Sequence, residues 1–484
     1  MSFNSFAFLA ILPLVAAGYH LICCQLGWPW SQAFLLAASL LFYVYPRPSN
    51  LPLLLGSILF NWAIARAMWR QRDPRHRKVL LWVGVIANIS LLLVCKRPDL
   101  VFKAIPLLHG PHVAAANWPL PLGVSFFTFT QIMYLIDAYP SPPTSPAALR
   151  IYQGLLRPNS LFEHATFVSL FPYVVSGPLV KARSVVPQLR MNTMAEPPLY
   201  LACRGIFLVA LGLAKKVVLG DAFATIADAG FGAPRDFTMA EAWVFCSAAL
   251  LHLYFDFSGY SDMAVGAAWM LGIDIPQNFN APLRARSITE FWQRWHISLS
   301  NFITDYLYKP MLRLMPRRSV AASALATVLS MVIAGLWHGP TWTFVAWGLL
   351  HGTALAVNQV WSRRNIRMPN GLGWLLTTMF VTSTIVFLRA ADLGEALHML
   401  TRLAPHENPL GMAALRNHLV FTPTLILRPV VVGAFAAYLF KSSKEYSKRF
   451  RPTFATAAAS AALIVVSALF MNSAPARVFV YFGF

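Results

Sequence analysis

A chain of 484 residues in which 57% are hydrophobic and only 12% are charged carries more apolar surface than one water-soluble core can bury. The formal net charge of +21 would suit a nucleic-acid partner, but the basic residues gather in short loops between apolar stretches. Lys and Arg in such loops are typical of the cytoplasmic side of a membrane protein, where anionic lipids attract them. The composition therefore excludes a soluble globular domain and indicates a membrane protein that contacts lipids and binds no nucleic acid.

Apolar stretches follow one another along the whole chain. No acidic or basic residue precedes Arg47, so the residues before it supply two stretches of suitable length. Further stretches lie near 50–68, 79–96, 119–138, 202–220, 240–272, 321–338, 341–361, 372–389, 425–440 and 455–473, with a weaker one at 160–180. Because about 20 apolar residues cross a bilayer as a helix, the pattern predicts an all-α polytopic protein with about 11 to 13 transmembrane or re-entrant helices.

Two carboxylates lie inside the mostly apolar block at 240–272. Asp256 and Asp262, with Ser258 between them, are costly at membrane depth unless they face a pathway or a partner. His252 precedes Asp256 by one helical turn, so the two side chains could touch on one helical face. The sequence is equally consistent with carboxylates that only link helices.

Polar residues concentrate between two apolar blocks, from Asp274 to Arg318. Ser287 and Glu290 have the spacing of a capping box, in which each side chain accepts from the other residue's amide, so we expect a helix to begin there. Helical spacing then predicts one apolar stripe along a continuous helix, formed by Ile288, Phe291, Trp292, Trp295, Leu299, Phe302, Ile303 and Tyr306. His296 lies on or beside this stripe. The opposite side carries Arg294, Ser298, Asn301 and Asp305.

A second histidine stands at a sharper break. His338 is followed by Gly339 and Pro340, which end a helix because Gly adopts the left-handed conformation and Pro cannot donate the next backbone hydrogen bond. Thr341 can cap the helix that follows. Broken helices at membrane depth survive only where protein or a water-filled cavity satisfies the backbone, so the break predicts a site around His338. The carboxyl end of a helix also favours a protonated imidazole, which suits a proton acceptor.

Tryptophans stand next to both of these histidines. Such residues pack in protein or line the membrane interface more often than they bind substrate, and the sequence leaves these roles open for Trp292, Trp295, Trp337 and Trp342. A further histidine, His351, is interpreted as a core residue.

Sequence motifs in a fixed order run over nearly the whole chain. They are Pro121–Phe129, Tyr134–Asp137, Phe171–Pro172, Ser176–Pro178, Gly212–Val218, Tyr254–Asp262, Asn278–Asn280, Phe291–Leu299, Gly335–Gly339 and Phe479–Phe482. One such motif would be weak, whereas the ordered set is specific. Together they resemble the membrane-bound O-acyltransferases, and within them the bacterial subgroup of alginate O-acetyltransferases and teichoic-acid D-alanyl transfer proteins.

The resemblance implies a single membrane domain in which a ring of helices surrounds a central funnel or tunnel. Its parts would be N-terminal helices at 1–118, a motif-bearing catalytic core at 119–361 and C-terminal helices at 362–484, together forming one domain over 1–484. The family has one histidine deep in the membrane and a second on the preceding segment. His338 matches the first and His296 the second, so both are expected to be catalytic.

The activity that the resemblance implies is O-acetylation of an exopolysaccharide such as alginate or cellulose, in a bacterial inner membrane. Acetyl-coenzyme A or another acyl thioester would be the cytoplasmic donor, with no permanently bound cofactor and no metal. His338 would act as general base on the acceptor hydroxyl, while His296 would orient a substrate. The acceptor would be the polysaccharide itself or a periplasmic acetyltransferase partner. Substrate-binding candidates are Asp256, Ser258, Asp262, Asn280, Trp292, Arg294, Trp295, Asn301, Asp305 and Trp337.

Two alternatives stay open at the level of sequence. The first is transfer of D-alanyl or another acyl group to a cell-envelope polymer, which the same motifs permit. The second is a transporter of polysaccharide or lipid-linked sugar, which would also have about twelve spans and intramembrane charges. Against transport, the spans show no internal two-fold similarity, and transport gives no reason for a histidine at a tight helix break.

Overall fold

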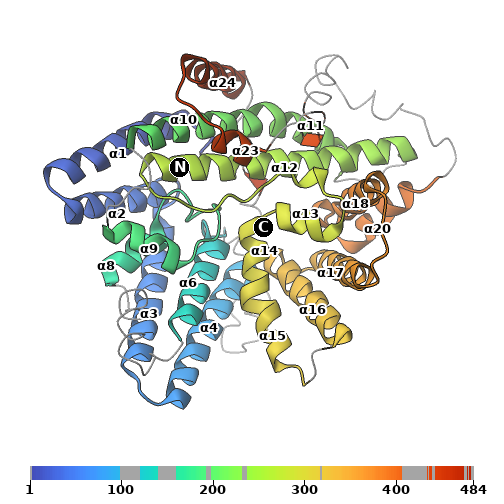
Figure 1. Cartoon of the computed structure of the whole chain (residues 1–484), viewed down its shortest axis with the longest axis horizontal. Coiled ribbons are helices and arrows are strands. Elements are labelled where there is room, and N and C mark those ends of the chain that lie inside the picture. Colours follow the sequence, from blue (N-terminus) through green and yellow to red (C-terminus); the bar gives the residue numbers. More distant parts are fainter. Residues whose placement is uncertain are drawn as a thin grey trace, which may run out of the picture. The chain divides into compact units, whose positions relative to one another are not determined.

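The computed structural model describes residues 3–98, 120–139, 160–191, 198–231, 237–316, 319–405, 433, 435, 437–438, 442–473, 477 and 479–480. In these parts of the chain every regular element is a helix (Figure 1), so the expected all-α class is confirmed. The apolar stretch expected at 425–440 lies almost wholly outside the described residues.

Within the described ranges, six helical segments are long and apolar enough to cross a bilayer. They are α1 (Phe6–Gln25), η1 with α3 (Pro48–Arg70), α4 (Pro74–Lys96), α16 (Val320–His338), α18 with α19 (Asn370–Arg389) and most of α24 (Phe454–Asn472). Two shorter apolar helices are α2 (Trp28–Val44) and α6 (Val124–Ala138). Large apolar side chains such as Leu14 and Leu469 are exposed, as a lipid-facing surface requires. The protein is therefore a multi-pass membrane protein.

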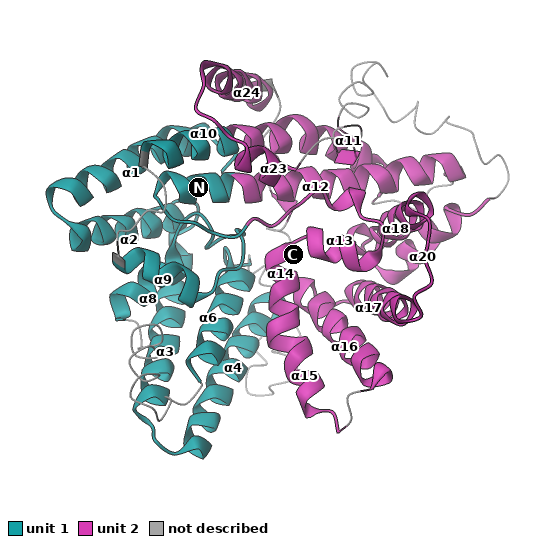
Figure 2. Cartoon of the chain, viewed as in Figure 1, with its two compact units in different colours: residues 1–209, 263–276, 483 teal, residues 210–262, 277–482, 484 magenta. Residues whose placement is uncertain are grey.

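The helices belong to two compact units (Figure 2). Unit 1 comprises residues 1–209, 263–276 and 483, and unit 2 comprises residues 210–262, 277–482 and 484. Besides α1, α2, α4 and α6, unit 1 contains η1 (Pro48–Asn50), α3 (Leu51–Arg70), α8 (Leu161–Ser169), α9 (Ala182–Met191), most of α10 (Pro198–Ala214) and the end of α12 (Met239–Met270). The single membrane domain over 1–484 stays a prediction, because compact units within one chain do not decide between one domain and two.

Unit 2 contains most of α12 and the hairpin that carries His338. Its elements are the π-helix η3 (Lys215–Gly220), α11 (Asp221–Gly230), η4 (Pro282–Arg284), α13 (Ile288–Arg294), α14 (Ile297–Phe302), the π-helix η5 (Ile303–Tyr308), α15 (Lys309–Leu314), α16 (Val320–His338), α17 (Trp342–Arg363), α18 (Asn370–Thr384), α19 (Val386–Arg389), α20 (Leu393–Arg402), α23 (Ser443–Lys448) and α24 (Phe454–Ser473).

A reciprocal pair of amides links α3 and α4 inside unit 1. Asn88 Nδ2 donates to Asn61 Oδ1 at 2.7 Å, and Asn61 Nδ2 donates to Asn88 Oδ1 at 3.3 Å. Both side chains are buried. A buried amide in an apolar helix is unfavourable unless its hydrogen bonds are made, so this pair favours one register of the two helices.

Small residues let α16 and α17 approach closely inside unit 2. A Cβ added to Gly348 on α17 would lie 2.5 Å from the main-chain oxygen of Met331 on α16, and one added to Gly335 would collide with the main-chain oxygen of Phe344. Membrane helices use glycine in this way to bring backbones together. The close hairpin fixes the end of α16, where His338 lies, against the first turns of α17.

The helix expected after Ser287 is shorter than the sequence predicts. It begins at Ile288 as expected, and Ser287 Oγ accepts from the Glu290 amide at 3.1 Å. The predicted hydrogen bond from the Ser287 amide to the Glu290 side chain is wrong, because Glu290 Oε2 accepts from the Arg286 amide instead, at 2.7 Å. The prediction of one continuous helix with a single apolar stripe is also wrong, because α13 ends at Arg294 and α14 begins only at Ile297.

Substitution of Gly348 by Ala should destabilise the α16–α17 hairpin by about 1–3 kcal/mol, because the new methyl group overlaps a backbone carbonyl that cannot move freely. The matched control is Gly371→Ala on α18, where no atom lies within 4 Å of the new Cβ. Alanine there should be neutral or slightly stabilising, because it favours helix. Thermal denaturation of the detergent-purified variants measures both. Equal melting temperatures for the two variants would contradict the close packing of the hairpin.

Candidate active site

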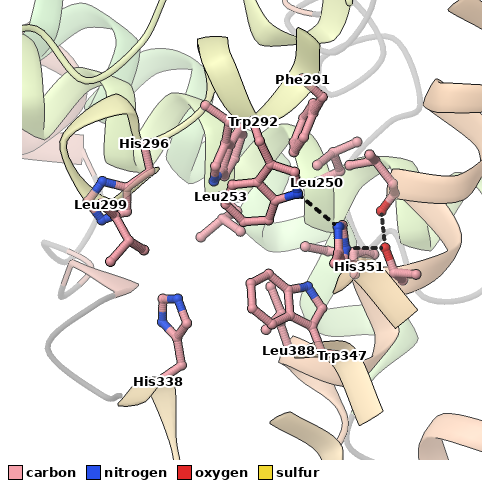
Figure 3. A pocket seen from close by; sticks show the side chains of 14 residues that line it. Leu250, Leu253, Phe291, Trp292, His296, Leu299, His338, Trp347, His351 and Leu388 are labelled. Carbon is pink, nitrogen blue, oxygen red and sulfur yellow. Dashed lines mark hydrogen bonds between the residues drawn. The ribbon is translucent and has the colours of Figure 1, made fainter. Parts of the chain in front are cut away.

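One small pocket in unit 2 collects side chains from several helices. Its volume is about 30 Å³, and its walls are mainly aromatic and aliphatic. It is lined by Leu250, Leu253, Phe291, Trp292, Trp295, His296, Leu299, His338, Trp347, His351, Val381, Thr384, Ile385 and Leu388. Figure 3 shows that the imidazoles of His296, His338 and His351 all border this space. The structure therefore brings together two histidines singled out by sequence and adds a third.

His296 occupies the link between α13 and α14 in an unusual backbone conformation. Its φ of 41° and ψ of 55° are left-handed, a region that non-glycine residues enter rarely and at an energetic cost. Trp295 before it is extended, so the chain turns sharply between the two helices. The turn directs the fully buried His296 ring toward the pocket, and the ring of Phe257 packs against it at 4.7 Å. A straight helix would point this ring elsewhere.

Asn278 holds that turn in place. Its main-chain oxygen accepts from the Ile297 amide at 2.9 Å, and its Oδ1 accepts from the Ser298 amide at 3.1 Å. These are the first two amides of α14, which have no partner within their own helix. Asn278 Nδ2 donates in turn to Ser261 Oγ on α12 at 3.4 Å. The sequence reasoning noted Asn278 only within a family motif and missed this bracing role.

His338 is the last residue of α16, as the sequence predicts, but for a different reason. Gly339 has a φ of −169°, which is extended rather than left-handed. Glycine is required there because a Cβ would lie 2.5 Å from the ring of Phe344. Thr341 does precede α17, yet its hydroxyl pairs with the Thr343 hydroxyl at 2.8 Å and does not cap an amide. Both parts of the expected capping chemistry are therefore corrected.

Aromatic rings surround His338 on several sides. The centroid of its ring lies 4.6 Å from that of Trp337, 5.5 Å from that of Trp347 and 6.1 Å from that of Phe344. Only 5% of the residue is exposed. An imidazole in such surroundings is held by packing and not by solvent, which limits the directions from which a substrate can approach it.

His351 was interpreted from sequence as a core residue, and the structure places it in the pocket wall. Trp292 Nε1 donates to its Nδ1 at 3.3 Å, and its Nε2 bonds Thr384 Oγ1 at 3.0 Å. It is buried, but it also borders the cavity beside Trp347 at 4.9 Å. Its spacing from His338 along the chain gave no signal, because the two residues lie on different helices of the hairpin.

The remaining predicted site residues divide by location. Trp292 and Trp295 line the pocket. Arg294 binds Glu290 at 2.7 Å, and Asp305 binds Lys309 at 2.7 Å; both pairs are solvent-accessible and outside the pocket lining. The lining also excludes Trp337, next to His338, and the exposed Asn301 on α14. Their substrate-binding roles stay predictions.

Asp256 and Asp262 form ion pairs away from the pocket lining. Lys216 Nζ lies 2.7 Å from Asp256 Oδ1, and Lys215 Nζ lies 2.7 Å from Asp262 Oδ2. The Val480 amide also donates to Asp256 at 2.9 Å, so His252 is not needed as its partner. These pairs join η3 to α12.

Nearby polar residues extend this arrangement. Asp262 also accepts from Ser443 Oγ at 2.6 Å, and Asn280 Oδ1 accepts from Ser442 Oγ at 2.9 Å, so both residues contact the start of α23. Ser258 is fully buried on α12 and does not line the pocket. Among the residues that the structure describes, no three His, Cys, Asp or Glu side chains are grouped to hold a metal ion.

Comparison with known proteins adds the chemistry that this geometry can serve. Residues 81–388 match the model of the MBOAT, membrane-bound O-acyltransferase, family, a range that contains every residue lining the pocket. The chain belongs to the membrane-bound O-acyltransferase family. The resemblance seen in its sequence motifs is thereby confirmed, and the protein is an O-acyltransferase.

Several relatives of this O-acyltransferase are named for acyl transfer to peptidoglycan, alginate or teichoic acid. A peptidoglycan O-acetyltransferase of Helicobacter pylori is 32% identical over 100% of this chain and 97% of its own length. A protein named "Probable alginate O-acetylase AlgI" of Pseudomonas aeruginosa is 33% identical over 82% of this chain and 74% of its own length. A teichoic acid D-alanyltransferase of Streptococcus thermophilus is 26% identical over 61% of this chain and 68% of its own length.

Replacement of Asn278 by Ala should lower acyl transfer by about tenfold or more, because small displacements of a catalytic group can cost up to about a hundredfold in rate. The variant loses the acceptor for the Ser298 amide and so loosens the turn at His296. Ser261→Ala removes only the longer bond at 3.4 Å and should have a smaller effect. Transfer rates in membrane vesicles, normalised to the amount of protein, measure the difference. Wild-type rates for Asn278→Ala would argue against this brace.

Replacement of Asp256 by Asn should reduce the free energy of unfolding by about 1.5–3 kcal/mol, because the buried Lys216 loses one of two carboxylate partners and keeps only Asp221 at 2.6 Å. The control is Asp305→Asn in an exposed ion pair with Lys309, where the loss should stay below about 0.5 kcal/mol. Thermal denaturation in detergent compares the two. If both variants had the same melting temperature as wild type, the Lys216–Asp256 pair would not stabilise unit 2.

Proposed function

We propose that this O-acyltransferase moves acetyl groups from a cytoplasmic thioester, acetyl-coenzyme A, to hydroxyl groups of a glycan outside the cytoplasm, and that it resides in the bacterial inner membrane. The observation that carries the proposal is the pocket in which His296 and His338 meet among apolar and aromatic side chains. Its volume of about 30 Å³ suits a short acyl group. The two relatives named for O-acetylation, each more than 30% identical, support acetyl as that group.

In the proposed reaction His338 is the general base. Its neutral imidazole takes the proton of the acceptor hydroxyl while the hydroxyl oxygen attacks the thioester carbonyl carbon. The new ester C–O bond forms, the C–S bond breaks, and the imidazolium returns its proton to the departing sulfur. A positioned general base contributes on the order of 10² to 10⁴ in rate. His296 orients the donor or the acceptor across the pocket.

Two glycans are candidates for the acceptor. Peptidoglycan is supported by a relative that aligns with the whole chain and with nearly its own whole length. An exopolysaccharide such as alginate is supported by a relative of similar identity that covers a smaller share of each chain. Either glycan would receive acetyl directly or through a periplasmic acetyltransferase partner. D-alanyl transfer has weaker support, because the relative named for it is 26% identical over 61% of this chain.

Replacement of His338 by Ala should lower glycan acetylation by at least about a hundredfold, because the general base is lost. The matched control is His76→Ala, which removes a histidine that is largely exposed in the first turn of α4. Ester-linked acetyl is measured separately in purified peptidoglycan and in exopolysaccharide, from cells whose membranes contain equal amounts of each variant.

The outcomes of this experiment separate the candidate functions. Loss of acetyl from one glycan while polymer export persists supports the acyltransferase mechanism and names the acceptor. Undiminished acetylation in His338→Ala would exclude His338 as the base. Lost export of polymer with acetylation intact would instead favour transport.

A further inference from the structure

The pocket is small compared with the acyl groups that thioesters can carry. Its volume of about 30 Å³ is far below the ~300–1,000 Å³ of pockets that take drug-sized ligands, so the space beside the histidines suits a short acyl group. A longer acyl chain would press against the packed side chains that form the pocket wall.

Two tryptophans form one wall of the pocket. This tryptophan wall consists of Trp292 and Trp347, whose rings meet at 5.7 Å and 73°. Trp347 also lies 5.5 Å from the ring of His338. Figure 3 shows both indoles between His351 on one side and the rings of His296 and His338 on the other. The position of these indoles therefore limits the space available beside the base.

A series of hydrogen bonds with a fixed direction holds the tryptophan wall from the side of His351. An indole N–H can only donate, so His351 Nδ1 accepts from Trp292 at 3.3 Å. In a neutral imidazole the other nitrogen then carries the proton, and His351 Nε2 donates to Thr384 Oγ1 at 3.0 Å. The Thr384 hydroxyl donates onward to the main-chain oxygen of Phe380 at 2.9 Å. The same hydroxyl also lies 3.2 Å from the main-chain oxygen of Val381, so its proton stays within the last turn of α18 in either case.

All three side chains that make these hydrogen bonds are buried, which makes their arrangement rigid. Trp292, His351 and Thr384 are 7%, 2% and 4% exposed. If Trp292 swung away, the buried Nδ1 of His351 would lose its donor in surroundings of low polarity, where an unmade hydrogen bond is costly. His351 also packs at 4.9 Å against Trp347, so it contacts both members of the tryptophan wall.

We propose that the Trp292–His351–Thr384 chain sets the acyl-length limit of the enzyme, with His351 as a positioning residue that holds the tryptophan wall against the pocket. The proposal rests on the proposed acetyl transfer and adds the structural basis of its selectivity. One methylene in an apolar pocket changes specificity by about 10 to 200-fold. Wild type should therefore prefer acetyl to propionyl donors by a factor in that range.

The test compares acetyl-, propionyl- and butyryl-coenzyme A as donors in membrane vesicles that contain the full chain. Thr384→Val replaces the hydroxyl by a methyl group of similar size, and Trp292→Phe keeps a ring but removes the N–H. Both should raise the ratio of the propionyl transfer rate to the acetyl transfer rate by about tenfold, the lower end of the selectivity that one methylene provides. The ratio is taken within each variant, so a lower amount of folded protein does not change it.

Two matched variants control for changes in donor selectivity that do not arise from the Trp292–His351–Thr384 hydrogen bonds. Thr384→Ser keeps a hydroxyl that can accept from His351 and should retain the wild-type ratio. Ser383→Ala removes a hydroxyl that donates to the same Phe380 carbonyl at 2.9 Å but does not line the pocket, and it should also retain that ratio. A change in all four variants would indicate general loosening of α18 and overturn the proposal.

The remaining outcomes separate this proposal from the proposed function. Wild type that transfers propionyl as well as acetyl would overturn the size limit, and an unchanged ratio in both Thr384→Val and Trp292→Phe would overturn the role of the hydrogen-bond chain. In both cases acetyl transfer itself would stand. Wild type that transfers no acyl group from any of the three donors would overturn the thioester donor, and the length limit with it.

Discussion

Backbone amides that are buried away from water must find hydrogen-bond partners, and a helix break removes the partners that a helix would supply. At the break between α13 and α14 the partner is Asn278, which accepts from the amides of both Ile297 and Ser298. This brace permits the left-handed conformation of His296. The pocket depends on it, because the direction of one of its histidines is decided by the turn and not by the helix on either side.

The charged residues of unit 2 support the same region without entering the pocket. Two consecutive lysines on the π-helix η3 bind two carboxylates on α12, one pair being Lys216 with Asp256 and the other Lys215 with Asp262. π-helical turns are rare and often occur at functional sites, since the wider turn redirects side chains. Here the turn lets successive lysines meet carboxylates on the same helix. Buried charges of this kind fix the arrangement of helices more than they add to stability.

The pocket itself is apolar in a way that suits acyl transfer. Its polar groups are few and belong to histidine, tryptophan and threonine, while aliphatic residues of α12, α14, α18 and α19, with Ile385 between the last two, close the remaining walls. Excluding water from such a site would strengthen the hydrogen bonds within it and would protect the proposed thioester donor from hydrolysis. The close α16–α17 hairpin and the turn after α13 bring the histidines to this space from two directions.

Signals that act over a few residues could be predicted from the sequence. Hydropathy predicted the all-α membrane class, the Ser287 cap predicted the start of α13, and Gly339 with Pro340 predicted the end of α16 at His338. Caps and apolar runs work through neighbours along the chain, so the sequence contains all of their chemistry. The family motifs likewise singled out His296 and His338 before their geometry was known.

Features that depend on residues far apart in the chain could not be predicted in this way. The apolar stripe after Ser287 predicted one helix, but Asn278 from an earlier segment stabilises a turn at His296 instead. His351 looked like an ordinary core residue until Trp292 and Thr384, from two other helices, were placed at its two nitrogens. An all-α membrane protein with histidines at two marked positions therefore follows from the sequence alone. Only the tertiary structure decided which side chains meet there, because hydrogen bonds and packing between distant segments have no local pattern in the chain.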